Sequence, residues 1–203
     1  MKKPVLAWHF LTEEYVPEEG IRKKPMYVGH LWRVKGPIGL CKRGLHGSIL
    51  PLDALYYAPG PIVTRTAHSG TVIHGEDKLV STRRKILGMA DATTVLHEFA
   101  CDVTEQIMQR ADTTDEGCWA ALEVKRRWIR GEATDEELMA AWWNAWDFSR
   151  HTFNAASWAT DASAWTVAWS CAWAAERDLT WMELNADLES RFLRLLGMEE
   201  DHD

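Results

Sequence analysis

The spacing of apolar residues changes at about residue 90, and this change constrains the fold more than any other feature of the chain. Before it, short apolar runs with a two-residue alternation are separated by turns that contain Gly and Pro, a pattern typical of antiparallel strands. After it, apolar residues recur every three or four positions over long stretches, as in amphipathic helices. We therefore predict an α+β fold, with a small antiparallel β-rich N-terminal module packed against a helical C-terminal module.

Turn residues divide the first half into short elements. We expect strands at 5–11, 26–34, 38–41, 62–67, 71–74 and 79–87. A short helix is expected at 50–57, because Pro51 suits the first turn of a helix and the run Ala58-Pro59-Gly60-Pro61 forbids its continuation. The dipeptide Ser69-Gly70 has turn composition, so the strands on either side of it are expected to form a hairpin.

The second half carries helix start and stop signals. A stripe of apolar residues at four-residue steps lies between positions 95 and 107. Thr134 and Thr180 each precede a Glu by three positions, the form of a capping box that opens a helix, and Gly197 suits a helix end. Three parts follow from these signals: a basic β-rich module at 1–89, an acidic Trp-rich helical module at 90–197 and an acidic tail at 198–203.

The net charge of −7 conceals opposite charges in the two halves. Residues 1–90 contain 14 Lys and Arg against 7 Asp and Glu, a net +7, whereas residues 91–203 contain 9 against 23, a net −14. A basic half could attract phosphates or nucleic acid, or it could dock on the acidic half of the same chain. We favour the internal interpretation, because no run of Lys and Arg exceeds three residues and no nucleic-acid motif accompanies the charge.

Tryptophan is the compositional outlier, since ten of the twelve lie between residues 119 and 181. Several are four or seven positions apart with Ala, Ser or Thr between them, which places the rings on one helix face and lets helices approach closely. We interpret the region as a Trp-packed helical hairpin or bundle. The alternatives are a ring-stacking platform for bases or a ligand and a surface for a homo-oligomer or another partner.

Several classes of protein are not indicated. No apolar run approaches the ~20 residues of a membrane helix, and residues 1–9 lack the sustained apolar stretch of a secretory signal. The four cysteines show no CxxC or CxxxC spacing, which favours reduced thiols over a zinc site. His30, His68 and His74 lack the close spacing of metal ligands. We therefore expect no membrane segment, no metal and no cofactor.

The densest polar cluster is the run Arg43-Gly44-Leu45-His46-Gly47-Ser48. A His between glycines can project from a strand end with the backbone close to a ligand, and Tyr and Arg residues follow it. These side chains could hold a phosphate or a nicotinamide-like ring, and the structural alternative is a His bonded to its own turn. The candidate ligand-binding residues are His46, Ser48, Tyr56, Tyr57, Arg65, Arg83 and Arg84.

No motif assigns a catalytic residue. The chain lacks GxSxG, a P-loop and GxGxxG. His97 and Cys101 share a helix face, but without a nearby oriented acid we interpret them as core residues. Asp161 lies in a stretch of Ala, Ser and Trp, and a buried acid there would need a cation such as Arg150. Whether the chain is an enzyme therefore stays open.

Residues 43–87 resemble an uncharacterised family of phage and prophage genomes. The run 43–48, the stretch Leu52-Asp53-Ala54-Leu55-Tyr56-Tyr57-Ala58-Pro59-Gly60-Pro61 and the run Gly75-Glu76-Asp77-Lys78-Leu79-Val80 are similar to its GLHxS…DALxYAPG…DKLV signature. An Ala- and Trp-rich helical tail follows that signature. The chain departs from the family at Gly47, where Ala is expected, and in its high Trp content. The resemblance implies a phage setting, hence the cytoplasm of a bacterial host, and a domain of unknown function.

A more distant similarity is to the ADP-ribosyltransferases, which often place His-Gly-Ser at a strand end to hold NAD and a downstream Tyr to stack on nicotinamide. It implies a ribose contact for His46 and stacking for Tyr56 or Tyr57, with Glu76 as the available acid. The leading hypothesis is a phage-associated accessory protein that binds a host protein or a small anionic ligand. An NAD-using enzyme and a protein that self-assembles through the Trp-rich helices are the alternatives, and nucleic acid is not expected as a partner.

Overall fold

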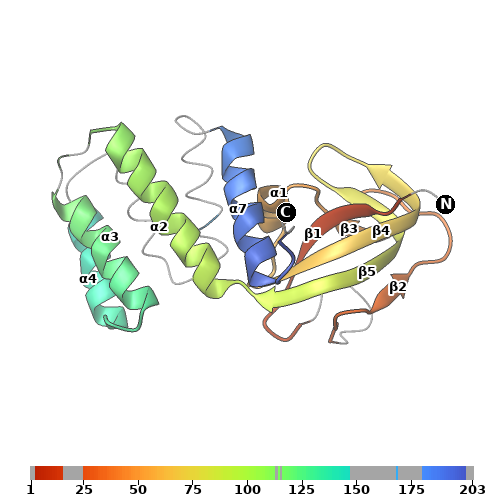
Figure 1. The fold of residues 1–203 in the computed structure, drawn as a ribbon, viewed down its shortest axis with the longest axis horizontal. Coiled ribbons are helices and arrows are strands. Elements are labelled where there is room, and N and C mark those ends of the chain that lie inside the picture. The colour runs from red at the N-terminus through yellow and green to blue at the C-terminus, as the bar shows by residue number, and fades with distance from the viewer. Residues whose placement is uncertain are drawn as a thin grey trace. The chain divides into compact units, whose positions relative to one another are not determined.

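A computed structural model describes residues 3–15, 25–112, 114, 116–146, 168 and 180–199. Its strands are β1 (Val5–Leu11), β2 (Leu31–Arg33), β3 (Leu45–Gly47), β4 (Ile62–His74) and β5 (Leu79–Asp91). Its helices are α1 (Pro51–Tyr56), α2 (Thr93–Arg110), α3 (Glu116–Ile129), α4 (Asp135–Trp146) and α7 (Trp181–Leu195). The α+β prediction is confirmed, because an antiparallel five-stranded sheet occupies the N-terminal half and helices occupy the C-terminal half (Figure 1).

The sheet has the strand order β1-β4-β5-β2, and β3 pairs with β5 beside β2. A further bridge joins the residue after β3 to β1. Trp8 N donates to the Ser48 carbonyl at 2.7 Å, and Ser48 N donates to the Trp8 carbonyl at 3.0 Å. The pairings β1-β4-β5-β3 therefore return to β1, so the sheet curls toward a small barrel at this end.

The prediction of a hairpin within residues 62–74 is wrong, because β4 is one strand of 13 residues that pairs with β5. Gly70 has φ +78° at a shift in the β4–β5 register, so the dipeptide that resembles a turn is a bulge. A Cβ on Gly70 would lie 2.2 Å from Thr82 Oγ1, so this position requires Gly. The turn between the two strands comes later, where Gly75 N donates to the Lys78 carbonyl at 2.7 Å.

Two other expected strands are short or absent. Of the strand expected at 26–34 only β2 forms, between Gly29 and Gly36, which both have φ +88°. That left-handed conformation interrupts an extended chain. At 38–41 the structure has a turn with one isolated bridge, between Gly39 and Arg43.

The two faces of the sheet are covered by different side chains. One face carries a buried apolar cluster that consists of Leu11, Met26, Ile62 and Ile86. On the other face, Phe192 of α7 packs against Trp8 and Phe10 of β1, with ring centroids 5.4 and 5.9 Å apart. The Leu52 backbone N–H of α1 donates to Asn185 Oδ1 at 2.9 Å. The last helix is therefore joined to the sheet by apolar and polar contacts.

The chain forms two compact units. The sheet unit comprises Met1–Ala92 and Asn185–Asp203, and the helical unit comprises Thr93–Leu184. The sequence placed the whole last helix in the helical module, whereas its C-terminal part belongs to the sheet unit. The physical reason is Phe192, which is 0% exposed and lies against β1.

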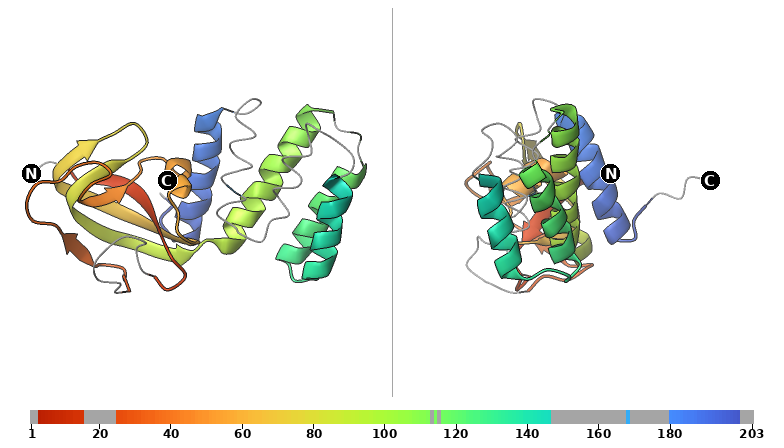
Figure 2. Two further views of the ribbon diagram at one scale, coloured as in Figure 1. Left: turned by 180° about the vertical axis from the view of Figure 1, so that it is seen from behind. Right: turned by 90° about the vertical axis from the view of Figure 1, so that its left-hand side faces the viewer.

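The described helices of the helical unit include α3 and α4, which lie side by side (Figures 1 and 2). Both predicted capping boxes are confirmed. Glu137 N donates to Thr134 Oγ1 at 3.2 Å, and Thr134 N donates to Glu137 Oε2 at 2.8 Å. Thr180 and Glu183 make the same two bonds before α7. The predicted packing of the Trp-rich stretch falls mostly outside the described residues.

Candidate functional site

His46 and Ser48 are held by contacts within the sheet unit. His46 lies in β3, and its Nε2 accepts from the Cys41 backbone N–H at 3.3 Å. This contact is the structural alternative, in which the histidine is bonded to its own turn. Ser48 is 2% exposed and forms the bridge to Trp8. In this arrangement His46 supports the turn before β3, and Ser48 supports the closure of the sheet.

Tyr56 and Tyr57 lie at the surface, where α1 ends, with ring centroids 4.8 Å apart. The Tyr57 hydroxyl donates to Asp77 in the turn between β4 and β5. Lys78 Nζ lies 3.9 Å from the centroid of the Tyr57 ring. Burial, followed by the bond to Asp77, raises the pKa of Tyr57 above its ordinary value. The two tyrosines therefore belong to a surface cluster that joins α1 to this turn.

Arg65 is engaged in an ion pair. Its NH2 atom lies 3.3 Å from Glu189 Oε1 of α7, and its guanidinium carbon lies 4.3 Å from the centroid of the Trp8 ring. Trp8 Nε1 donates to the same carboxylate oxygen at 3.3 Å. Burial lowers the pKa of Arg65, and the charge of Glu189 opposes that effect. Arg65 therefore fastens α7 to the sheet.

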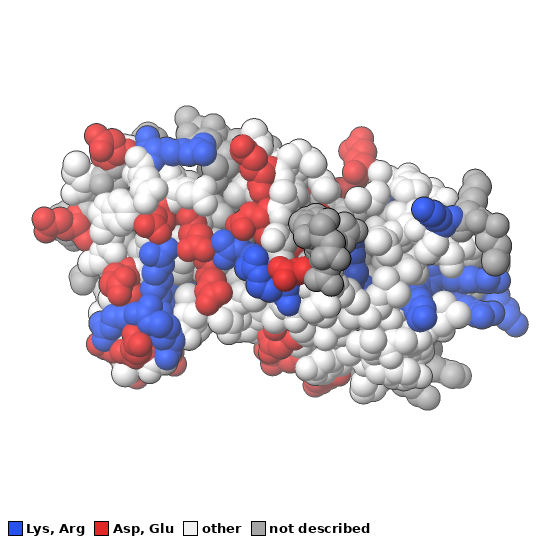
Figure 3. All heavy atoms as spheres, in the orientation of Figure 1, with Lys and Arg blue, Asp and Glu red and all other residues white. Residues whose placement is uncertain are grey.

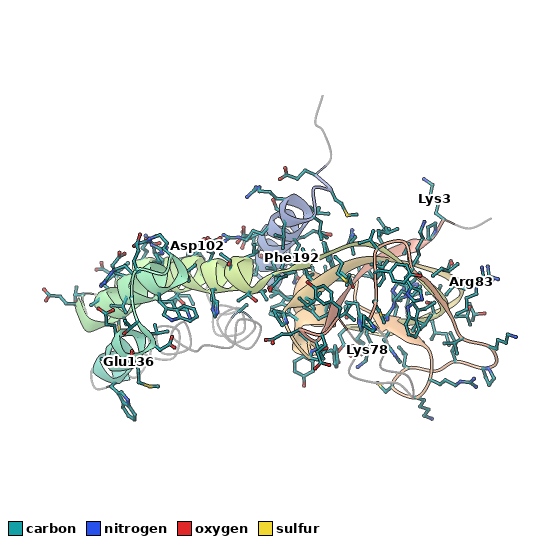
Figure 4. The ribbon with its side chains drawn as sticks, turned by 90° about the horizontal axis from the view of Figure 1, so that it is seen from below. Lys3, Lys78, Arg83, Asp102, Glu136 and Phe192 are labelled. Atoms are coloured by element: carbon teal, nitrogen blue, oxygen red, sulfur yellow. The ribbon has the colours of Figure 1, made fainter. Side chains whose placement is uncertain are left out.

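Arg83 and Lys85 of β5 and Arg33 of β2 are exposed, and we name this group the basic edge. Arg33 lies directly opposite Arg83 in the ladder. No carboxylate of the described residues makes an ion pair with any of the three. In Figure 3 basic side chains gather without acidic neighbours over the end of the sheet unit that carries β2, and in Figure 4 Arg83 and Lys3 project outwards there. Among the described residues the basic edge therefore has no neighbouring counter-charge.

Arg84 lies between two residues of the basic edge but points to the opposite face of β5. It is 3% exposed. Its NH1 atom donates to the His46 carbonyl at 2.7 Å, and its NH2 atom lies 3.9 Å from Met26 Sδ. Its Nε atom has no hydrogen-bond partner among the described residues. Burial lowers the pKa of Arg84 to about 10, so the guanidinium keeps its charge at neutral pH.

His68 of β4 lies directly opposite Arg84 and is fully buried. Its Nδ1 lies 2.8 Å from Ser81 Oγ, and its Nε2 lies 3.1 Å from Thr66 Oγ1. Each hydroxyl also lies 2.9 Å from a backbone carbonyl, so its single proton can be donated either to that carbonyl or to the ring. A Cβ on Gly47 would lie 2.8 Å from His68 Nε2. An alanine at position 47 would therefore displace this ring.

Burial and Arg84 hold two histidines in the neutral form. Burial, then the charges of Arg84 and His46, lowers the pKa of His68 to about 3. Burial, then Arg84, also lowers the pKa of His9 well below its ordinary value. A neutral imidazole has one N–H, so His68 can donate to only one of its two hydroxyl neighbours. The inner face of the sheet therefore combines a charged guanidinium with uncharged rings.

The residues that share the inner face of the sheet with Arg84 carry little functional signal in the sequence. The sequence indicates no role for His9 and Trp32, and it suggests His30 only as a metal ligand. In the structure His9 Nε2, His30 Nδ1 and Trp32 Nε1 are buried without hydrogen-bond partners among the described residues. The signal that could have found the site is strand alternation, which puts Arg84 on the same face as the buried Ile86.

His97 and Cys101 of the helical unit are core residues, as interpreted from the sequence. They are 2% and 1% exposed, and the His97 ring packs edge-on against Trp128 with centroids 5.2 Å apart. Burial raises the pKa of the Cys101 thiol to about 12. The protonated thiol is not a nucleophile at neutral pH. The pair suggested for Asp161 and Arg150 falls outside the described residues.

The described residues contain neither a metal-binding cluster nor a helix that could span a membrane. No three His, Cys, Asp or Glu side chains of the described residues are arranged to hold a metal ion. None of the described helices combines the length and the apolarity that crossing a membrane requires. Comparisons with protein-family models, with curated proteins and with solved structures find no significant match. Function is therefore inferred from the residues and contacts of this chain.

Proposed function

We propose that this chain is a phage- or prophage-associated accessory protein that binds an acidic surface of a host protein through the basic edge. The observation that carries the proposal is the exposure of Arg33, Arg83 and Lys85 at neighbouring positions without an ion-pair partner among the described residues. Like charges opposite one another in a sheet repel, and a negatively charged partner removes that repulsion. The resemblance of residues 43–87 to the phage family supports the setting.

The neighbours of the basic edge favour a protein surface as the partner. Leu6, Ala67, Lys85 and Leu31 lie directly opposite one another across β1, β4, β5 and β2, so their side chains form one row on one face. Leu6 and Leu31 are 45% and 41% exposed. A sheet face that combines exposed leucines with cations suits a protein interface with an apolar centre and a charged rim.

No described contact favours the NAD-using alternative. The Nε2 atom of His46 already accepts from the backbone, and the Tyr57 hydroxyl is bonded to Asp77. Glu76 is exposed in the turn between β4 and β5. The self-assembly alternative depends on the Trp-rich helices, most of whose residues lie outside the described ranges. We therefore propose one function.

Binding of a fluorescein-labelled decaglutamate peptide, followed by fluorescence anisotropy at low salt, tests the proposal. The variant R33A/R83A/K85A removes the basic edge. The matched variant R127A/R130A/R194A removes the same amount of positive charge from three arginines that contact carboxylates. The two variants have equal net charge and differ only in where charge is lost.

We expect the basic-edge variant to bind the peptide roughly 10- to 100-fold more weakly, because each exposed charge contact contributes about 0.5–1 kcal/mol. The matched variant should bind the peptide as the wild type does. Added salt should weaken peptide binding by the wild type and by the matched variant. Equal losses in the two variants would mean that net charge alone drives binding, which contradicts the proposal. If a single-stranded oligonucleotide of the same charge bound more tightly than the decaglutamate peptide, this result would contradict the proposal of a protein partner.

A further inference from the structure

The inner face of the sheet holds a positive charge without a described counter-ion. Arg84 is 3% exposed, and no described carboxylate makes an ion pair with it. Its NH1 atom donates to a neutral acceptor, the His46 carbonyl, and its Nε atom has no partner among the described residues. A buried charge without a partner is strongly unfavourable. The unpaired charge of Arg84 therefore favours a negatively charged ligand beside its guanidinium.

Three ring nitrogens near Arg84 also lack hydrogen-bond partners among the described residues. They are His9 Nε2, His30 Nδ1 and Trp32 Nε1. Trp32 lies directly opposite Arg84 in the β2–β5 ladder, and its ring centroid is 5.0 Å from that of His30. His30 and Trp32 are half-buried at the edge strand β2. The group therefore extends from the buried guanidinium to the surface at this edge.

We propose that Arg84, Trp32, His30 and His9 bind one small oxyanion, a phosphate or carboxylate group, on the inner face of the sheet. The indole Nε1 and the guanidinium Nε can only donate, and a neutral imidazole supplies one further N–H. An oxyanion accepts from these groups and neutralises Arg84, whereas water would satisfy the donors but leave the charge. The site is separate from the basic edge, because Arg83 and Lys85 point to the opposite face of β5.

Thermal unfolding of the full chain in sodium sulfate and in sodium chloride at equal ionic strength tests the site. Sulfate has the shape of a phosphate group, and its charge does not change near neutral pH. Because sulfate also stabilises proteins in general, the variant R84M measures that non-specific part. The variant W32F removes one donor, and R83A/K85A removes cations of the basic edge only.

We expect the unfolding midpoint of the wild type to rise by several degrees in sulfate over chloride and to saturate, as binding to the folded state requires. R84M should show only the non-specific, unsaturating part. W32F should need about 5- to 10-fold more sulfate for half-saturation, the effect of one lost hydrogen bond. R83A/K85A should respond as the wild type does, so the inner site and the basic edge are tested separately.

The same sulfate response in the wild type and in R84M would overturn the inner site. If R84M does not fold, W32F is the deciding variant. Half-saturation of W32F at the same sulfate concentration as the wild type would then overturn the inner site. A nucleoside monophosphate distinguishes the two sources of the oxyanion. Saturation at lower concentration than sulfate assigns the group to a larger ligand, and saturation at the same concentration assigns it to a free anion.

Discussion

The arginines of the helical unit and those on β5 have opposite surroundings. In the helical unit the NH2 atom of Arg126 lies 3.0 Å from Asp102 Oδ1 and 2.5 Å from Glu105 Oε2. Arg127 of α3 and Arg130, just after the helix, also contact carboxylates. On β5, exposed Arg83 and buried Arg84 have no ion pair among the described residues. Burial does not explain the difference, because on β5 neither the exposed nor the buried arginine has an ion-pair partner among the described residues.

This comparison separates charges that serve the fold from charges that are available to a ligand. The carboxylates of α2 hold Arg126 on α3, so that ion pair joins two helices of one unit. Arg65 has the corresponding role in the sheet unit, where it joins β4 to α7 through Glu189. Arg83 and Arg84 join no elements through ion pairs among the described residues. The two binding proposals made above rest on these two charges.

The largest effect should come from the side chain that joins the last helix to the sheet. Phe192→Ala removes a fully buried ring from against Trp8 and Phe10, which should cost the sheet unit about 3–5 kcal/mol of stability. Hydrogen exchange should accelerate in β1 and β4, while α3 and α4 keep their protection. Met182→Ala, at a 62% exposed position of the same helix, is the control. Equal acceleration in both units would refute their separation.

Acid should destabilise the sheet unit through its neutral histidines. The folded-state pKa of His68 is about 3, and that of His9 is also well below the ordinary 6.5. Between these values and 6.5 the unfolded chain binds protons that the folded chain does not, so stability is complete above pH 6.5 and falls as the pH decreases. Each histidine should contribute a slope of about 1 kcal/mol per pH unit within that window.

Urea unfolding between pH 6.5 and pH 5, above the range in which ordinary carboxylates titrate, measures this slope. His68→Asn should make the slope shallower, because it removes one of the two depressed groups. A wild-type stability that does not vary over this range would show that the two histidines are not held neutral in the fold.

Local chemistry made the elements with strong end signals predictable. The capping boxes at Thr134 and Thr180 and the stop at Gly197 depend on residues within a few positions of one another, and all three occur in the structure. The bulge at Gly70 was mistaken for a turn, because both need a residue with positive φ and the sequence does not show which strand pairs with which. Only the pairing of β4 with β5 distinguishes them.

The candidate site was predictable only in part, for the same reason. Sequence reasoning named Arg83 and Arg84 together, but it did not separate the exposed residue from the buried one. Alternation along β5 separates them once the strand is known. His9 and Trp32 could not be grouped with Arg84 from the sequence, because they meet it only through the pairing of distant strands.

The most direct test of the central claim compares the stability of two single variants, one from each kind of surrounding. Arg126→Ala should lower the free energy of unfolding in urea by about 1 kcal/mol, because two carboxylates lose their partner. Arg83→Ala should leave that free energy unchanged or raise it slightly, because the substitution removes the repulsion between Arg83 and Arg33, the like charge directly opposite it. A loss in Arg83→Ala as large as that in Arg126→Ala would show that the charge serves the fold, and would contradict the account.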